Sequence, residues 1–168
     1  HHLFEDAMKH IARIVLVITN TGGYALLVGV SGSGKQSLSR LSAFICGFAV
    51  IQIGISSTYC INDLKDDLKA MCNKAGVKEE GVMFLLTDSQ IANEGFLIYI
   101  NDLLASGNIP DLFATDEQDT IVNAVTNKVK ALGKVPDRGT CWAYFIEQIR
   151  KNLHVVFAFF PVGLLRRI

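Results

Sequence analysis

A short segment near the start of the chain, Gly29 to Ser37, has the composition and spacing of a phosphate-binding loop. It reads GVSGSGKQS and follows the apolar run Ala25 to Val28, which is typical of a buried strand. Two glycines and Lys35 satisfy the motif G-x-x-x-x-G-K-[S/T] up to its lysine, but Gln36 stands where a Ser or Thr hydroxyl normally reaches Mg²⁺. The spacing predicts a site for the phosphates of a nucleotide, with an altered magnesium side.

Backbone N–H groups and one side-chain charge would hold the phosphates in such a loop. Glycine allows positive φ and has no Cβ, so Gly29, Gly32 and Gly34 let the backbone wrap closely around a phosphate. Lys35 adds a mobile charge, and the helix expected from about Gly34 adds its positive end. The alternative is a glycine-rich turn that binds nothing. The expected phosphate-binding residues are Gly29, Val30, Ser31, Gly32, Ser33, Gly34, Lys35, Gln36 and Ser37.

A carboxylate follows a later apolar run. Val82 to Leu86 leads into Thr87 and Asp88, and a buried strand that ends in an Asp delivers a carboxylate to the Mg²⁺ side of many nucleotide sites. Asp88 and Gln36 are therefore the expected magnesium-side residues, and ATP or ADP with Mg²⁺ is the expected ligand. The alternative for Asp88 is a helix N-cap, a place that also favours Asp.

The residues that would cleave a nucleotide are harder to find. Hydrolysis needs a base that orients water, usually an acidic residue directly after such an Asp, and Ser89 stands there instead. Glu94 is either a solvated helix residue or a more distant base. No catalytic residue is assigned, and whether this chain is an enzyme by itself stays open.

Composition indicates one domain with one core. Half of the 168 residues are apolar, and the 16 basic and 16 acidic residues cancel, so binding to nucleic acid or to a membrane surface is not expected. The longest apolar stretch, Leu41 to Ile55, is interrupted by polar residues and is too short to span a bilayer, and no signal peptide opens the chain. The four cysteines lack metal-site spacing, which predicts reduced thiols and a cytoplasmic setting: Cys46, Cys60, Cys72 and Cys141.

Strand-like and helix-like patterns alternate along the chain. Buried runs typical of strands are Ala25–Val28, Ala49–Ile55, Val82–Leu86 and His154–Phe160. Helical spacing of apolar residues occurs in Leu38–Phe48, Ile61–Met71, Phe96–Leu104, Ile121–Leu132 and Trp142–Ile149. The alternation predicts an α/β fold with a parallel sheet covered by helices on both faces, and with ligands at the carboxyl ends of the strands.

Four longer segments are more specific than the loop alone. They are LFEDAMKHIARI at Leu3 to Ile14, ALLVGVSGSGKQSLSRL at Ala25 to Leu41, FLLTDSQIANEGFLIYINDLLASGNIPDLF at Phe84 to Phe113, and FPVG at Phe160 to Gly163. Together they resemble the fourth AAA+ module of an axonemal dynein heavy chain, and the resemblance extends over nearly the whole chain.

The resemblance implies a P-loop AAA+ large subdomain with strands ordered 5-1-4-3-2. Such a module belongs to a ring of six that drives ciliary or flagellar movement, in the cytoplasm and cytoskeleton, at the axoneme. The implied partners are neighbouring AAA+ modules of the same heavy chain, with dynein intermediate and light chains and microtubules contacted through the whole motor. In that family the first module is the principal ATPase, whereas the fourth binds nucleotide and modulates the motor. Gln36 is the usual residue in axonemal fourth modules.

The resemblance also assigns residues outside the loop. Residues matching Leu3 and Phe4 lie against the adenine in the family's N-terminal loop, although Phe4 suits ordinary core equally well. Phe160 occupies the sensor position, which is usually small and polar, so Phe160 and Ser89 both disfavour hydrolysis. The fifth strand and the small helical subdomain would follow Ile168. We therefore expect residues 1–168 to be a partial large subdomain that alone aggregates or binds nucleotide weakly.

Three functions stay open from the sequence. The first is a regulatory module of an axonemal dynein that binds nucleotide with weak or absent hydrolysis. The second is an active ATPase module in which Glu94, or a group from a neighbouring module, positions water. The third is a structural spacer without nucleotide, which Ser89 and Phe160 favour and the intact glycines and Lys35 oppose.

Overall fold

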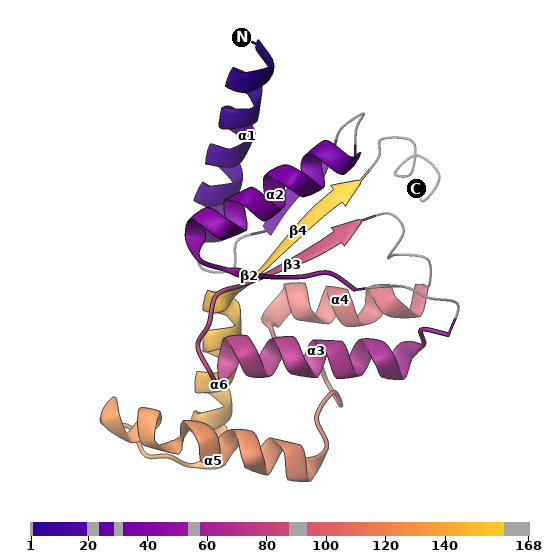
Figure 1. Ribbon diagram of the computed structural model, residues 1–168. Coiled ribbons are helices and arrows are strands. Elements are labelled where there is room, and N and C mark those ends of the chain that lie inside the picture. The colour runs from indigo at the N-terminus through magenta and orange to yellow at the C-terminus, as the bar shows by residue number, and fades with distance from the viewer. Residues whose placement is uncertain (1, 20–23, 29–31, 54–57, 88–93, 160–168) are drawn as a thin grey trace.

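Helices and strands alternate about a parallel sheet (Figure 1). The structure is a computed structural model that describes residues 2–19, 24–28, 32–53, 58–87 and 94–159. In chain order the elements are α1 (His2–Thr19), β1 (Tyr24–Val28), α2 (Gly32–Cys46), β2 (Ala49–Ile51), α3 (Ile61–Gly76), β3 (Val82–Thr87), α4 (Glu94–Ser106), α5 (Thr115–Ala131), α6 (Arg138–Asn152) and β4 (Leu153–Phe159).

The four described strands lie in the order β1-β4-β3-β2. All neighbours are parallel, with Tyr24 opposite Val155 and Ala49 opposite Val82. Parallel neighbours require crossover connections, which the intervening helices supply. The α/β prediction is thus confirmed, and the observed order matches the 1-4-3-2 part of the order that the resemblance implied.

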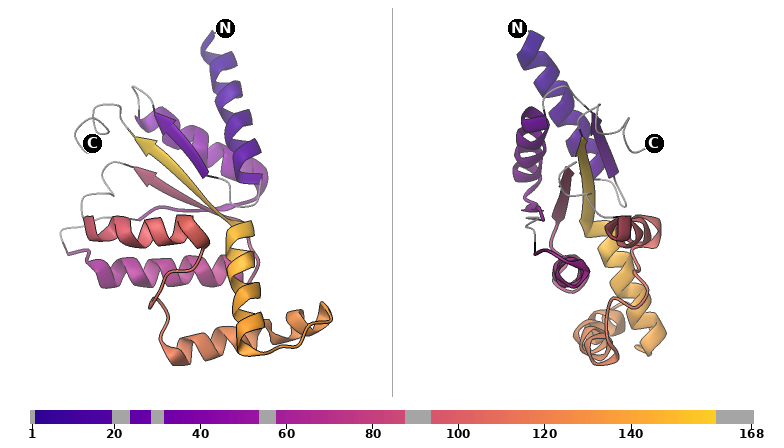
Figure 2. Two further views of the ribbon diagram at one scale, coloured as in Figure 1. Left: turned by 180° about the vertical axis from the view of Figure 1, so that it is seen from behind. Right: turned by 90° about the vertical axis from the view of Figure 1, so that its right-hand side faces the viewer.

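Helices cover both faces of the sheet (Figure 2). Successive side chains of a strand point to opposite faces, so β3 sends Phe84 and Leu86 to one side and Met83 and Leu85 to the other. The face with Phe84 and Leu86 packs against α3, α4 and α6. The face with Met83 and Leu85 packs against α2 around Ala43. The expectation of a sheet buried on both faces is confirmed for these strands.

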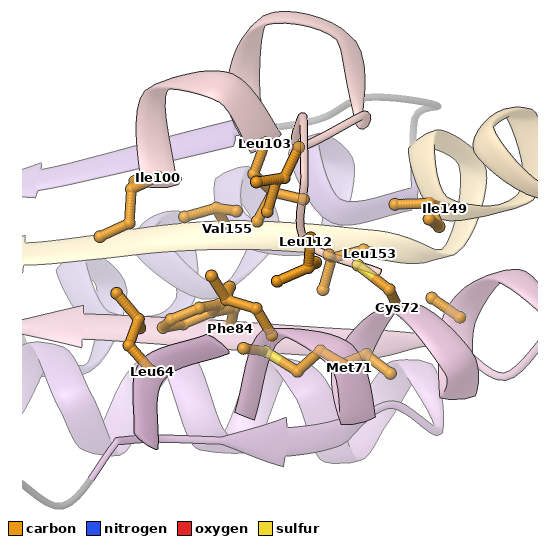
Figure 3. Packing of buried hydrophobic residues seen from close by; sticks show 14 of the residues in the cluster. Leu64, Met71, Cys72, Phe84, Ile100, Leu103, Leu112, Ile149, Leu153 and Val155 are labelled. Carbon is orange, nitrogen blue, oxygen red and sulfur yellow. The ribbon is translucent and has the colours of Figure 1, made fainter. Parts of the chain in front are cut away.

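The larger core lies between the sheet and α3, α4 and α6. Figure 3 shows Phe84 of β3 pointing into the same space as Leu64 and Met71 of α3, with Ile100 of α4 across from them. Leu64, Met71 and Phe84 have no exposed surface. Burial of side chains of this size contributes roughly 1.5–3 kcal/mol each, so this cluster holds β3 firmly in the middle of the fold.

The helices α5 and α6 form an arm that extends away from the sheet (Figure 1). They enclose a small core of their own, made by Val125, Val129 and Cys141. The arm joins the main core through the segment between α4 and α5, where Ile109, Leu112 and Phe113 are buried. The run NIPDLF within that segment is thereby explained by packing.

Some predicted elements differ from the structure. The strand expected over Ala49–Ile55 is β2, which ends at Ile51, and Gln52 beyond it accepts a hydrogen bond from the Arg40 guanidinium of α2. The N-terminal loop implied by the resemblance is the helix α1 instead. Its residues carry apolar side chains at helical spacing, and α1 lies against α2 and β1. By contrast, Gly107 ends α4 as expected, with φ of 76°.

Two helical glycines provide a test of core packing. A Cβ on Gly76, the last residue of α3, would lie 2.4 Å from Cε2 of Phe145 and 2.9 Å from Cγ1 of Ile149. Gly76→Ala is therefore expected to destabilise the fold by about 1–3 kcal/mol through overpacking. A Cβ on Gly139 in α6 would meet only the Asp137 Oδ1 atom at 3.5 Å, so Gly139→Ala should leave stability unchanged or raise it by up to about 1 kcal/mol. Urea unfolding measures the free energy of unfolding of both variants. Equal changes in that free energy would contradict the prediction.

Candidate nucleotide-binding site

The predicted phosphate loop connects the carboxyl end of β1 to the amino end of α2. β1 ends at Val28 and α2 begins at Gly32, so the helix starts two residues before the Gly34 expected from the sequence. Gly29, Val30 and Ser31 lie outside the described residues. The first N–H groups of a helix have no acceptor within it, and they form the positive end of its dipole. The amino end of α2 therefore has the chemistry that an anion requires.

The remaining loop residues form the first two turns of α2. Lys35 is the fourth residue of this helix and Gln36 the fifth, and the side chains of residues 32–36 lie outside the description. Ser37 follows them on the helix and is exposed. The backbone thus brings Gly32, Ser33, Gly34 and Lys35 to one helix terminus.

Several small side chains of α2 are buried. Ser39, Ser42 and Ala43 have no exposed surface, and Ala43 packs against Met83 and Val156 of the central strands. The Ser42 hydroxyl donates to the Leu38 carbonyl at 2.8 Å, which satisfies it within the helix. The helix that follows the loop therefore rests on a rigid layer.

The strands that precede the predicted magnesium and sensor positions end beside each other. β3 ends at Thr87, which pairs with Ala158 of β4, one residue before that strand ends. Both strands are parallel to β1, so all three lead toward the same edge of the sheet. Asp88, Ser89 and Phe160 themselves lie outside the described residues. Glu94 is the first residue of α4, and its side chain is not described.

The adenine candidates lie in a helix. Leu3 and Phe4 belong to the first turn of α1, and their side chains are not described. The helix runs from His2 to Thr19 toward the start of β1. Their contact with adenine remains a prediction.

An aromatic contact near the start of α3 had no signal in the sequence. The Tyr59 hydroxyl donates to Asp67 Oδ2 at 2.5 Å, and the Tyr59 ring meets Phe96 edge to face with centroids 5.7 Å apart. Burial, followed by the bond to Asp67, raises the pKa of the Tyr59 hydroxyl well above its usual range. The contact joins the start of α3 to α4, and it depends on tertiary packing that local spacing does not report.

Other sites on the described residues are few. Cavities of about 480 Å³, beside Glu79 and Tyr144, and about 390 Å³, beside Phe113 and Trp142, both lie on the α5–α6 arm. The four cysteines are free thiols in the structure. Within the described ranges, no group of three or more His, Cys, Asp or Glu side chains is placed to hold a metal ion. No helix among them is long and apolar enough to cross a membrane.

Comparison with known families settles the relationship that these features suggest. Residues 2–168 match the family described as the P-loop containing dynein motor region D4. The chain belongs to this family. The resemblance to the fourth module of axonemal dynein heavy chains is therefore confirmed, and the D4 match covers every element of the fold, from α1 to β4.

Curated dyneins align over nearly the whole D4 chain. It is 56% identical over 161 residues to the dynein alpha chain of the flagellar outer arm from Chlamydomonas reinhardtii, an alignment that covers 96% of this chain. It is 53% identical to human dynein axonemal heavy chain 9, also over 96% of the chain. It is 51% identical to the ciliary dynein beta chain of Tripneustes gratilla over 99%. The chain spans about 4% of the length of each of these relatives.

Proposed function

We propose that this D4 region is a nucleotide-binding regulatory module of an axonemal dynein heavy chain. Gly29 to Ser37 would hold the phosphates of ATP or ADP, and Lys35 would neutralise the terminal groups. Leu3 and Phe4 would contact the adenine. Hydrolysis at this module would be weak or absent.

One observation carries the proposal of binding. The motif lies where a parallel strand, β1, leads through the loop to the amino end of the fifteen-residue helix α2. Unsatisfied N–H groups and the helix dipole act together at such an end, which supports a phosphate site there before any side chain is considered. The packing of Ala43 against Met83 and Val156 of the sheet holds this helix in place.

The magnesium side rests on Gln36 and Asp88. When bound, Mg²⁺ neutralises the charge of the phosphate oxygens. The Asp88 carboxylate suits this ion because Mg²⁺ prefers oxygen ligands, and Gln36 offers an amide oxygen from the second turn of α2. An amide carries less charge than a carboxylate, so we expect this module to hold Mg²⁺ mainly through the nucleotide and Asp88.

The proposal extends to the motor through the relatives. Their names place them in flagellar outer arms, in cilia and in axonemes. We infer the same location for this chain, and a microtubule motor that drives ciliary or flagellar movement as its setting. Neighbouring AAA+ modules of the same heavy chain would be its direct partners, and intermediate chains, light chains and microtubules would be reached through the whole motor.

Cleavage of bound ATP separates the regulatory role from an active ATPase. Glu94 is the first residue of α4, and the segment before it follows the carboxyl end of β3, so Glu94 is the acid that the sequence offers to an active module. We expect Glu94→Gln to leave single-turnover ATP cleavage at this module unchanged within about twofold. The reason is that the base position directly after Asp88 holds Ser89.

The assay uses the intact motor, with the other nucleotide sites disabled, and Glu147→Gln as the matched control. Glu147 lies on α6, remote from the loop along the chain, and is exposed. If Glu94→Gln abolishes cleavage while Glu147→Gln does not, the module is an active ATPase and the regulatory proposal is wrong.

A further inference from the structure

His154 is a buried histidine between the sheet and α2. It is the second residue of β4, opposite Met83 of β3, and it is 2% exposed. Side chains alternate along a strand, so His154 lies on the same face of β4 as Val156, which packs against α2. Histidine is the side chain whose charge ordinarily changes between pH 5 and 8. The apolar layer between α2 and the sheet therefore contains a group that can gain a charge near neutral pH.

The imidazole of His154 lies flat against the ring of Phe48. The ring centroids are 5.2 Å apart, and the ring planes are within 9° of parallel. Phe48 itself is closely packed, because a Cβ on Gly81 would lie 2.1 Å from its Cδ1 atom. Exposing His154 to water therefore requires this layer of the core to open.

The end of α2 holds Phe48 in this position. Gly47 follows the helix with φ of 70°, and its N–H donates to the Phe44 carbonyl at 3.1 Å. The Phe48 N–H donates to the Ala43 carbonyl at 2.8 Å, which completes the hydrogen bonding of a Schellman motif. The aromatic neighbour of His154 is thus fixed to α2 by the backbone.

The surroundings of His154 disfavour a positive charge. The four strands and α2 contain no Asp or Glu. On α2, the Arg40 guanidinium donates to Gln52, burial raises the pKa of the Cys46 thiol, and the Lys35 side chain lies outside the description. The described charged residues of the other neighbouring segments on this side are exposed: Glu5, Asp6, Lys9 and Arg13 of α1, Glu80 before β3, and Glu147, Arg150 and Lys151 of α6.

We propose that His154 is a pH-sensitive element that permits tight packing of α2 on the sheet while its ring is neutral and weakens this packing when the ring is protonated. A charge placed in an apolar layer costs free energy unless a counter-charge or a hydrogen bond compensates it. The face of Phe48 attracts a cation and offsets part of this cost. A carboxylate would offset more, and the strands and α2 supply none.

The sign of the effect follows from which state binds the proton more readily. An opened or unfolded state exposes the ring to water, where it takes up a proton below about pH 6.5, whereas the closed layer resists the proton. The packing is therefore at full strength above that pH and weakens as the pH falls below it. His154 is at the amino end of β4, and the phosphate loop follows the carboxyl end of the parallel strand β1, so the inference does not rest on nucleotide binding.

Amide hydrogen exchange in the intact heavy chain tests the proposal. After correction for intrinsic exchange rates, we expect the protection of amides in α2 and β4 to fall about five- to tenfold from pH 7.5 to pH 5.5, since one proton changes the opening constant at most about tenfold per pH unit. Protection in α5, which packs outside this layer, should change less than about twofold. An equal change in α5 would mean that the fold responds to acid as a whole, and the proposal would be wrong.

Two variants and a second measurement assign the effect to His154. His154→Phe keeps a ring against Phe48 and His154→Leu keeps an apolar side chain, and neither can be protonated, so the pH effect on α2 and β4 should shrink below about twofold in both. The same pH effect in the wild type and the variants would overturn the proposal. Exchange of the imidazole C2 hydrogen, followed by mass spectrometry, needs no substitution. We expect His154 in the wild-type heavy chain to titrate about one pH unit or more below the same histidine in the denatured chain. Titration at the same or a higher pH would refute the proposal even if neither variant folds.

Discussion

Lys35→Ala is expected to weaken nucleotide binding at this module about 10- to 150-fold in the intact motor. Hydrogen bonds to a charged group contribute roughly 1.5–3 kcal/mol, and each 1.4 kcal/mol is a tenfold change in affinity. Lys35 is the fourth residue of α2, at the end of the helix where the backbone already favours an anion. The substitution removes the side-chain charge and leaves that backbone intact, so binding should weaken without being lost.

Arg40→Ala is the matched control for this prediction. It removes one positive charge from the same helix, but the Arg40 guanidinium donates to Gln52 at the end of β2. Its loss should therefore change nucleotide affinity less than about threefold. Equilibrium binding of a fluorescent ATP analogue, with the other nucleotide sites disabled, measures both variants. Equal weakening by the two variants would show that overall charge, and no specific contact with the phosphates, governs binding.

Local patterns in the sequence were sufficient to predict most of the fold. Runs such as Val82–Leu86 are apolar throughout because a parallel strand is buried on both faces, and the structure places this run in the middle of the sheet. The phosphate loop is likewise predicted from residues that are close in sequence, and its contact with a nucleotide stays a prediction. The same alternation of strands and helices predicts a carboxyl-edge position for Asp88, which lies outside the described residues.

Features that depend on distant packing could not be predicted in this way. The strand expected to reach Ile55 ends at Ile51, and Gln52 bonds to a side chain twelve residues away. The helix α1 lies where the family resemblance implied a loop, because its contacts with α2 and β1 are tertiary. The spacing of apolar residues predicted both helices of the α5–α6 arm, but it did not predict how the arm joins the main core.

That junction depends on Phe145, which is fully buried on α6. Its ring lies 5.1 Å from Trp142 and 5.9 Å from Phe113 between centroids, and one of its edges faces Gly76 of α3. The residue therefore joins α6, α3 and the segment before α5. Since α6 passes into β4 with no intervening loop, the same side chain also fixes the start of the central strand.

Phe145→Ala is accordingly expected to lower the free energy of unfolding by about 3–5 kcal/mol. The cost combines the lost burial of the ring, the cavity left beside Gly76, and the aromatic contacts with Trp142 and Phe113. Phe145→Leu retains part of the volume and should cost less than the alanine substitution. Ile98→Ala on the exposed side of α4 should cost less than about 0.5 kcal/mol.

Urea unfolding, with proteolysis as the readout, gives the free energy of unfolding of these three variants under one condition. A large loss for Phe145→Ala, with an unchanged dependence on urea, means that a cavity has formed in an otherwise intact fold. A loss as small as that of Ile98→Ala would mean that the arm moves independently of the sheet. In that case the packing of α6 would have no effect on β4, and the α5–α6 arm would be a separate unit attached to the rest of the fold.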